Sequence, residues 1–63
     1  MTFFEVQQLL KKFGTIIYTG DRSGDLLLME DELKDLYEHR MIDDEEYKKA
    51  RLAIMKETRA TKQ

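Results

Sequence analysis

The chain has 63 residues and therefore forms one domain, which at this size buries only about 60% of the surface that the unfolded chain exposes. It contains no cysteine, so disulfides and thiolate metal sites are excluded, and a single histidine does not make a zinc site. The net charge is −2, the N-terminus lacks the pattern of a signal peptide, and no apolar run approaches the roughly 20 residues that span a bilayer. We expect a cytoplasmic protein that needs no metal or cofactor and does not enter a membrane.

Residues 2–13 are predicted to form the first helix. Thr2 followed by Glu5 is the pattern of a capping box, in which each side chain hydrogen-bonds the backbone amide of the other residue. An apolar stripe recurs at steps of three and four residues, and Gly14 follows where a helix often ends in a left-handed residue. We expect the stripe, with its aromatic rings, to lie in the core. It consists of Phe3, Val6, Leu9, Leu10 and Phe13.

Residues 14–20 are predicted to form an extended connector. The letters TIIYT within it are rich in β-branched residues and are bounded by glycines. The rest of the sequence offers no second strand, so we expect no sheet. Instead, Ile16 or Ile17 should enter the core. Either Asp21 or Ser23 can cap the helix that follows, because both side chains have an oxygen that accepts from free backbone amides.

Two longer helices follow and are predicted to form a hairpin. The second covers residues 21–40, with one apolar seam and acidic residues on the opposite face. The third covers 43–58, where Asp43 and Glu46 give a start signal. Residues 59–63 are expected to fray. The predicted fold class is all-α, a compact three-helix bundle. The seams consist of Leu26, Met29, Leu33, Leu36 and Arg40 in the second helix, and of Tyr47, Ala50 and Ile54 in the third.

The charges are strongly segregated along the chain. Residues 1–20 carry a net charge of +1, residues 21–46 carry −8, and residues 47–63 carry +5. Two interpretations follow from this pattern. The acidic second helix and the basic third helix could pair with each other inside the bundle, or the basic end could face an anionic partner.

No arrangement of residues indicates catalysis. The chain has no cysteine nucleophile, His39 has no serine partner implied by spacing, and the carboxylates are too evenly spread to nominate an acid–base pair. The segment Gly20–Gly24 could bind phosphate at a helix N-terminus, but it lacks the spacing and the lysine of a P-loop. A bundle of this size also lacks the pocket volume that most enzymes need. We therefore expect a non-catalytic protein without a small-molecule substrate.

The third helix carries a second stripe, which is basic with two apolar residues at its centre. Cations with interleaved apolar groups suit single-stranded nucleic acid, where phosphates meet charge and bases meet apolar surface. The same stripe could dock on a partner protein or on a second copy of the chain. A structural alternative is that Leu52 and Met55 cover the first helix and widen the core. The stripe consists of Lys48, Leu52, Met55, Arg59 and Lys62, flanked by Lys49, Arg51 and Lys56.

Several short words of the sequence resemble those of one family. They are Phe13-Gly14, Ile17-Tyr18-Thr19-Gly20-Asp21-Arg22, Asp25-Leu26 and Leu28-Met29-Glu30-Asp31-Glu32-Leu33, followed by Leu36-Tyr37, Ile42, Tyr47 and Ala50. With these words the chain resembles the YqgQ family of small bacterial proteins over nearly its whole length. The resemblance implies a compact three-helix bundle and suggests that the protein binds single-stranded nucleic acid. It supplies no catalytic residues.

Residues 33–54 are also similar to the short helical hairpin modules called SHOCT. The similarity rests on Leu33, Leu36, Ile42, Glu46-Tyr47 and Ala50-Arg51, while Met41 stands where these modules usually have glycine. Such modules are usually appended to the ends of other proteins and are thought to mediate association. This second resemblance implies a role in association.

Two functional hypotheses follow. The first is a non-catalytic protein that binds single-stranded DNA or RNA, with Tyr18 as a stacking group. Arg22 joins its contacts because the sequence gives this residue no structural role. The alternative is a protein–protein interaction module or a homodimer that uses Leu52 and Met55. The predicted nucleic-acid contacts are Arg22, Lys48, Lys49, Arg51, Lys56, Arg59 and Tyr18.

Overall fold

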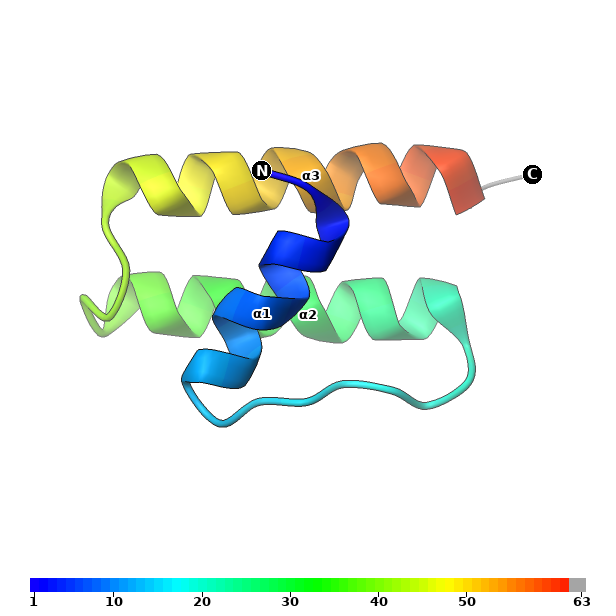
Figure 1. Cartoon of the computed structure of the whole chain (residues 1–63), viewed down its shortest axis with the longest axis horizontal. Coiled ribbons are helices and arrows are strands. Elements are labelled where there is room, and N and C mark those ends of the chain that lie inside the picture. The colour runs from blue at the N-terminus through cyan, green and yellow to red at the C-terminus, as the bar shows by residue number, and fades with distance from the viewer. Residues whose placement is uncertain (62–63) are drawn as a thin grey trace.

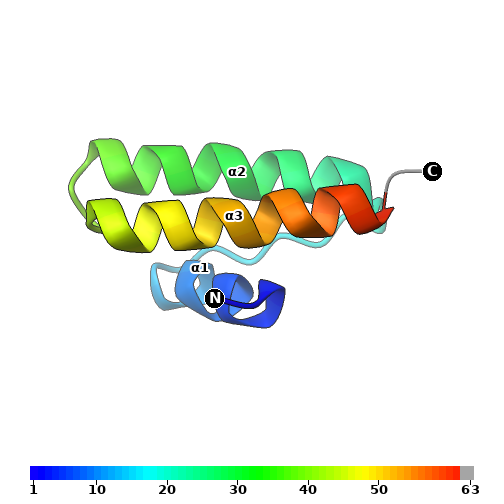
Figure 2. The same cartoon turned by 90° about the horizontal axis from the view of Figure 1, so that it is seen from above.

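The computed structural model describes residues 1–61, which form three helices: α1 (Phe3–Lys12), α2 (Arg22–Glu38) and α3 (Asp44–Thr61). α2 and α3 lie side by side as an antiparallel hairpin, and α1 crosses them (Figure 1). Seen from above, α1 lies on one side of the layer formed by the other two helices (Figure 2). The described residues contain no strand, which confirms the all-α three-helix bundle. None of these helices combines the length and the apolar character needed to cross a membrane.

The core lies where the three helices meet, and most of it is built from the apolar stripes that the sequence predicts. Ile42 and Ala53 join it although they were in none of these stripes, and the predicted seam residue Arg40 is exposed. Phe3, Phe13 and Ile17 pack partly buried against its edge, whereas Ile16 is exposed, so Ile17 is the connector residue that enters. Ala50 and Ala53 are small enough to let neighbouring helices approach α3 closely. The buried apolar residues are Val6, Leu10, Leu26, Met29, Leu33, Leu36, Ile42, Ala50, Ala53 and Ile54.

Both ends of α1 follow the local signals in the sequence. The Thr2 amide donates to Glu5 Oε1 at 2.7 Å and the Glu5 amide donates to Thr2 Oγ1 at 3.1 Å, which confirms the capping box. The hydrogen bond from the Thr2 backbone lowers the pKa of the Glu5 carboxyl below its ordinary value. At the other end, Gly14 has φ +86° and the Thr15 amide donates to the Leu10 carbonyl at 2.9 Å, as expected for a left-handed helix terminus.

The start of α2 is capped by Asp21 rather than Ser23. Asp21 has an extended backbone, and its Oδ2 accepts from the Gly24 amide at 3.3 Å. At the start of α3, Asp43 Oδ1 accepts from the Glu46 amide at 2.7 Å, as predicted.

The ends of α2 and α3 differ from their predicted positions. α2 ends at Glu38 instead of residue 40, because Arg40 adopts a left-handed conformation with φ 59°. The amide that follows, from Met41, then donates to the Leu36 carbonyl at 2.8 Å and closes the helix.

The prediction that α3 ends at residue 58 is also wrong, because the helix continues to Thr61. No glycine or proline interrupts it there, and Arg59 and Ala60 both have high helix propensity. Of the predicted frayed tail, residues 59–61 are therefore helical, and residues 62–63 lie outside the described part of the chain.

Candidate nucleic-acid interface

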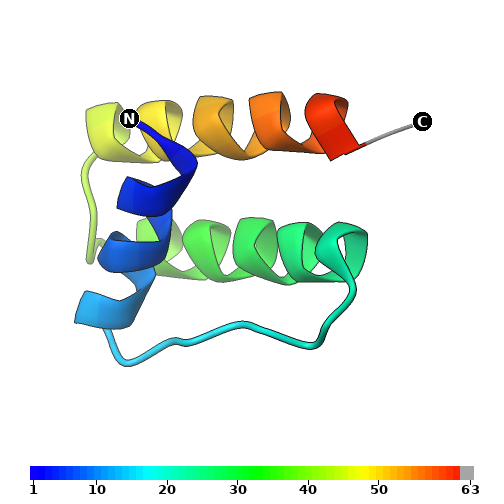
Figure 3. The ribbon, with the colours of Figure 1, turned by 45° about the vertical axis from the view of Figure 1, so that its right-hand side comes forward.

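The connector between α1 and α2 runs alongside α2 (Figures 1 and 3) and is fastened to it by two threonines. Thr15 Oγ1 donates to Glu32 Oε2 at 3.1 Å. Thr19 donates twice to Asp25 Oδ1, from its amide at 2.9 Å and from its hydroxyl at 2.6 Å. Asp25 is buried, so these bonds satisfy a polar group that water does not reach. Thr15 and Thr19 thus stabilise the fold by joining the connector to α2.

Arg22 has a structural role, contrary to our prediction. Its Nη1 lies 2.9 Å from Glu57 Oε2, and its guanidinium carbon lies 4.9 Å from the centre of the Phe3 ring. This one side chain of α2 therefore contacts both α1 and α3. The ion pair could not be predicted from the sequence, because Glu57 follows Arg22 by 35 residues.

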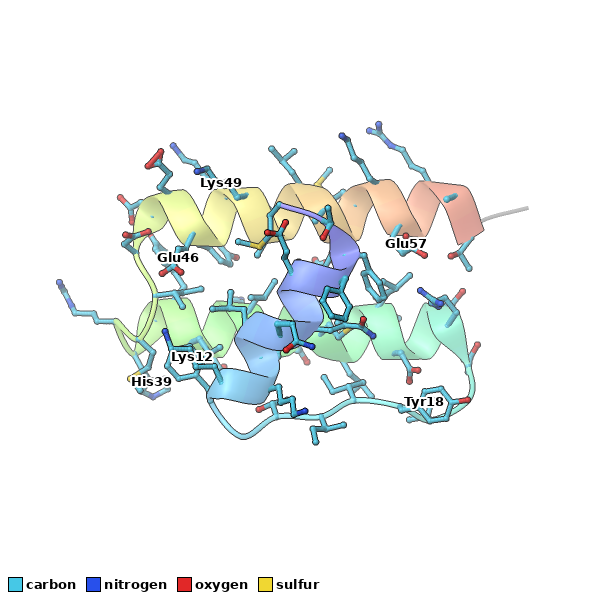
Figure 4. All side chains as sticks on the ribbon, viewed as in Figure 1. Lys12, Tyr18, His39, Glu46, Lys49 and Glu57 are labelled. Atoms are coloured by element: carbon cyan, nitrogen blue, oxygen red, sulfur yellow. The ribbon has the colours of Figure 1, made fainter. Side chains whose placement is uncertain are left out.

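Tyr18 does not lie near the basic residues of α3. Its side chain is 85% exposed, so it is free to contact a ligand. In Figure 4, however, Tyr18 lies on the connector beyond α2, whereas Lys49 lies at the edge of α3 that points away from α2. The structure therefore does not bring Tyr18 and the basic residues together into one surface.

The outer side of α3 is fully open to solvent and forms a surface that we call the basic face. Leu52 is 59% exposed and Met55 is 39% exposed, so the alternative that these residues cover α1 is wrong. Next to them is a hollow of roughly 250 Å³, to which Tyr47 also contributes. Lys62 lies outside the described residues. The basic face consists of Lys48, Lys49, Arg51, Leu52, Met55, Lys56 and Arg59, all of them exposed.

The one acid in the chain between Lys48 and Arg59 is turned away from this face. Glu57 is only partly exposed and points to Arg22, with which it forms the ion pair described above. Lys49 has a loose partner, since its Nζ lies 4.0 Å from Glu45 Oε1 at the preceding turn of α3. The charges that remain on the basic face are therefore all positive.

The acids of α2 do not neutralise the basic face. Within residues 1–61, the ion pairs are Arg22 with Glu57 and Lys49 with Glu45, and neither joins an acid of α2 to a base of α3. The interpretation that the acidic α2 and the basic α3 pair with each other therefore finds no ion pair within residues 1–61. Asp31 of α2 and Arg51 of α3 line one hollow without forming an ion pair, so both charges remain available to a partner.

Two tyrosines fix α3 against α2 beside the basic face. The rings of Tyr37 and Tyr47 stack with centroids 4.4 Å apart and planes 7° from parallel. The Tyr37 hydroxyl donates to Asp44 Oδ1 at 2.6 Å, and this hydrogen bond, together with the negative charge of Asp44, raises the pKa of Tyr37. Tyr47, predicted as an inner residue, is half-buried and also lines the hollow, so it joins the core to the surface.

Comparisons with known proteins agree with the resemblance found in the sequence. The YqgQ-like family model matches residues 1–60. The chain is 49% identical over 61 residues to the Uncharacterized protein YqgQ of Bacillus subtilis (strain 168), a match that covers 97% of this chain and 86% of that protein. The chain therefore belongs to the YqgQ-like family.

Proposed function

We propose that the protein binds single-stranded nucleic acid through the basic face and performs no catalysis. The observation that carries the proposal is the composition of this face. Five cations surround two exposed apolar side chains, Leu52 and Met55, on one side of a single helix. Phosphates would meet the cations while bases pack on the apolar centre, the combination that single-strand binders use.

The surroundings of the basic face favour a single strand over a duplex. A duplex keeps its base surfaces stacked inside, so the apolar centre of the face would have nothing to contact. Asp31 of the neighbouring α2 lines a hollow together with Arg51 and would repel the phosphates of a second strand. From Lys48 to Arg59 the face is about 16 Å long, which suits a short stretch of chain.

The two predicted contacts outside α3 take different parts in this proposal. Arg22 acts indirectly, since it neutralises Glu57 at 2.9 Å and so removes a negative charge from the helix that binds. Tyr18 lies beyond α2 and takes no part in the interface.

A salt titration with labelled oligothymidylate, oligouridylate and a duplex tests the proposal. The affinity for single strands should fall as salt rises. In a plot of the logarithm of the association constant against the logarithm of the salt concentration, the slope should be no steeper than about −3.5, the value for five cations. Lys56→Gln should reduce that slope by about 0.7, whereas Lys11→Gln on α1 should leave it unchanged. An affinity that is absent at low salt, or that salt does not weaken, would contradict the proposal. An amide-shift titration then shows whether the shifted residues lie on α3.

A second candidate function is association with protein. It is favoured by Leu52 and Met55, which are both exposed and line one hollow on α3, so they form a small contiguous apolar patch. The form of association that the structure favours involves a further surface, described next.

A further inference from the structure

The side of the hairpin that α1 leaves uncovered carries two adjoining hollows. One is lined by residues of both helices and the other by α3 alone, and they share Tyr47 and Arg51. No residue of α1 lines either hollow. We call this surface the rear face. It consists of Leu27, Glu30, Asp31 and Lys34 on α2, and of Tyr47, Lys48, Arg51, Leu52 and Met55 on α3.

The rear face has exposed apolar residues that the fold does not explain. Leu27 is 69% exposed on the α2 side, and Met55 is exposed on the α3 side. Neither belongs to the core of the bundle. Together with half-buried Tyr47, which lines both hollows, they form an apolar strip along both walls of the hairpin, of the kind that marks a contact surface.

The two walls of the rear face carry charge of opposite sign, and within residues 1–61 no ion pair joins one wall to the other. Asp31 on the α2 wall and Arg51 on the α3 wall line the same hollow, yet no ion pair joins them. The α2 wall adds Glu30 but also Lys34, and the α3 wall adds Lys48. The α2 edge of the face therefore has a net negative charge and the α3 edge is basic.

A surface with this division of charge is complementary to a second copy of itself. A two-fold axis in the plane of the face and parallel to the helices places the acidic wall of each copy over the basic wall of the other. It also brings the two hairpins together as four antiparallel helices, a common and stable arrangement. The other in-plane axis, perpendicular to the helices, would set acid on acid and base on base.

We propose that the protein forms a two-fold dimer through the rear face. In this dimer Asp31 of one copy pairs with Arg51 of the other, and Leu27 packs against Met55 of the other. The apolar strip is narrow, so we expect a weak dimer with a dissociation constant on the order of 100 μM. The dimer does not require the proposed nucleic-acid function. The two surfaces share Lys48, Arg51, Leu52 and Met55, so a bound strand would compete with dimer formation.

Sedimentation equilibrium of the full chain without nucleic acid, at low salt and from micromolar to millimolar concentration, tests the proposal. The wild-type chain should dimerise with rising concentration and dissociate as salt rises. Asp31→Lys and Arg51→Glu should each weaken the dimer at least tenfold, because each sets two pairs of like charges across the interface. Lys11→Glu makes the same change of charge as Arg51→Glu, but on α1, and should have no effect.

Mixing the two variants gives the sharpest result. In a dimer of one Asp31→Lys chain with one Arg51→Glu chain, both contacts again join opposite charges, so an equimolar mixture should recover the wild-type association. No effect within a single chain can produce this recovery. A wild-type chain that stays monomeric at millimolar concentration, or a mixture that stays monomeric, overturns the proposal. Circular dichroism confirms that each variant is folded, and Leu27→Ser provides a second disruption that changes no charge.

The outcomes also separate this proposal from the nucleic-acid function. A monomer that still binds oligonucleotides overturns the dimer alone, whereas a dimer that binds no oligonucleotide at low salt overturns the binding function alone.

Discussion

The segment Tyr18–Arg22 and the basic face of α3 both contain residues predicted to contact nucleic acid, Tyr18 and Arg22 in the segment and the cations on the face, yet their contacts in the structure differ. In the segment, Thr19 bonds Asp25, Asp21 bonds the Gly24 amide, and Arg22 pairs with Glu57. On the basic face, the described contacts include one loose pair, between Lys49 and Glu45. A polar residue whose bonds are satisfied within the chain stabilises the fold, whereas one that reaches only solvent is free to bind.

Asp25→Ala should cause the largest loss of stability among these substitutions. The substitution removes the acceptor of both Thr19 bonds and leaves an amide without a partner, so we expect a loss of about 2 kcal/mol in the free energy of unfolding. Urea denaturation measures it. Asp35→Ala removes an exposed carboxylate from the same helix and should change that free energy by less than about 0.5 kcal/mol. Equal effects of the two substitutions would mean that the segment is not held by Asp25.

Gly20→Ala tests the backbone of the same segment. Gly20 has φ +92° and no atom within 4 Å of an added Cβ, so the cost comes from the backbone conformation alone. We expect a loss of about 1 to 2 kcal/mol in the free energy of unfolding. Gly20→Asn should cost less, since asparagine tolerates positive φ better than alanine. An alanine variant as stable as the wild type would show that the segment relaxes to another conformation.

Arg22→Ala should have a smaller effect. The arginine side chain is 50% exposed and Glu57 is 31% exposed, so solvent screens the ion pair, and the contact with Phe3 adds to it. We expect a loss of about 1 kcal/mol at low salt and a smaller loss at high salt. Thermal unfolding at two salt concentrations measures both. Arg59→Ala, on the basic face, should leave the free energy of unfolding nearly unchanged at either salt concentration. If Arg59→Ala lost as much stability as Arg22→Ala, the two regions would not differ in their contribution to the fold.

The smallest effects on stability are expected for Tyr18→Ala and Leu52→Ser. Both side chains are largely exposed, so each substitution should change the free energy of unfolding by less than about 0.5 kcal/mol. Their effects on oligonucleotide affinity should differ. Leu52→Ser should weaken binding by about fivefold, or about 1 kcal/mol, through lost contact with bases, and Tyr18→Ala should leave it unchanged. The opposite result in anisotropy titrations would move the binding site to the connector.

The parts of the fold that follow from neighbouring residues are predictable from the sequence. Thr2 and Glu5 are three residues apart, and Gly14 directly follows the last residue of an apolar stripe, so the ends of α1 could be placed. The same holds for the cap of α3 at Asp43. For α2 the sequence left Asp21 and Ser23 as alternatives, because either side chain has the required oxygen and the choice depends on backbone angles.

Features that depend on contacts between distant residues could not be predicted in this way. The partners of Arg22 are set by how α1 and α3 pack, and the end of α2 is set by Arg40, whose residue type gives no sign of a positive φ. On α3, the steps of three and four place Leu52 and Met55 on one stripe and Ala50 and Ile54 on another. Only the rotation of the helix in the bundle decides which stripe faces inward.

The position of Arg22 also bears on how the molecule opens. Its guanidinium touches Phe3 at the start of α1 and Glu57 near the end of α3, while its backbone begins α2. The last turns of a helix usually fray independently of the rest of the protein. Here, unwinding α3 as far as Glu57 also releases the guanidinium from its charged partner and loosens the first turns of the other two helices. Amide hydrogens from all three helices at this end should therefore exchange with solvent in one cooperative event.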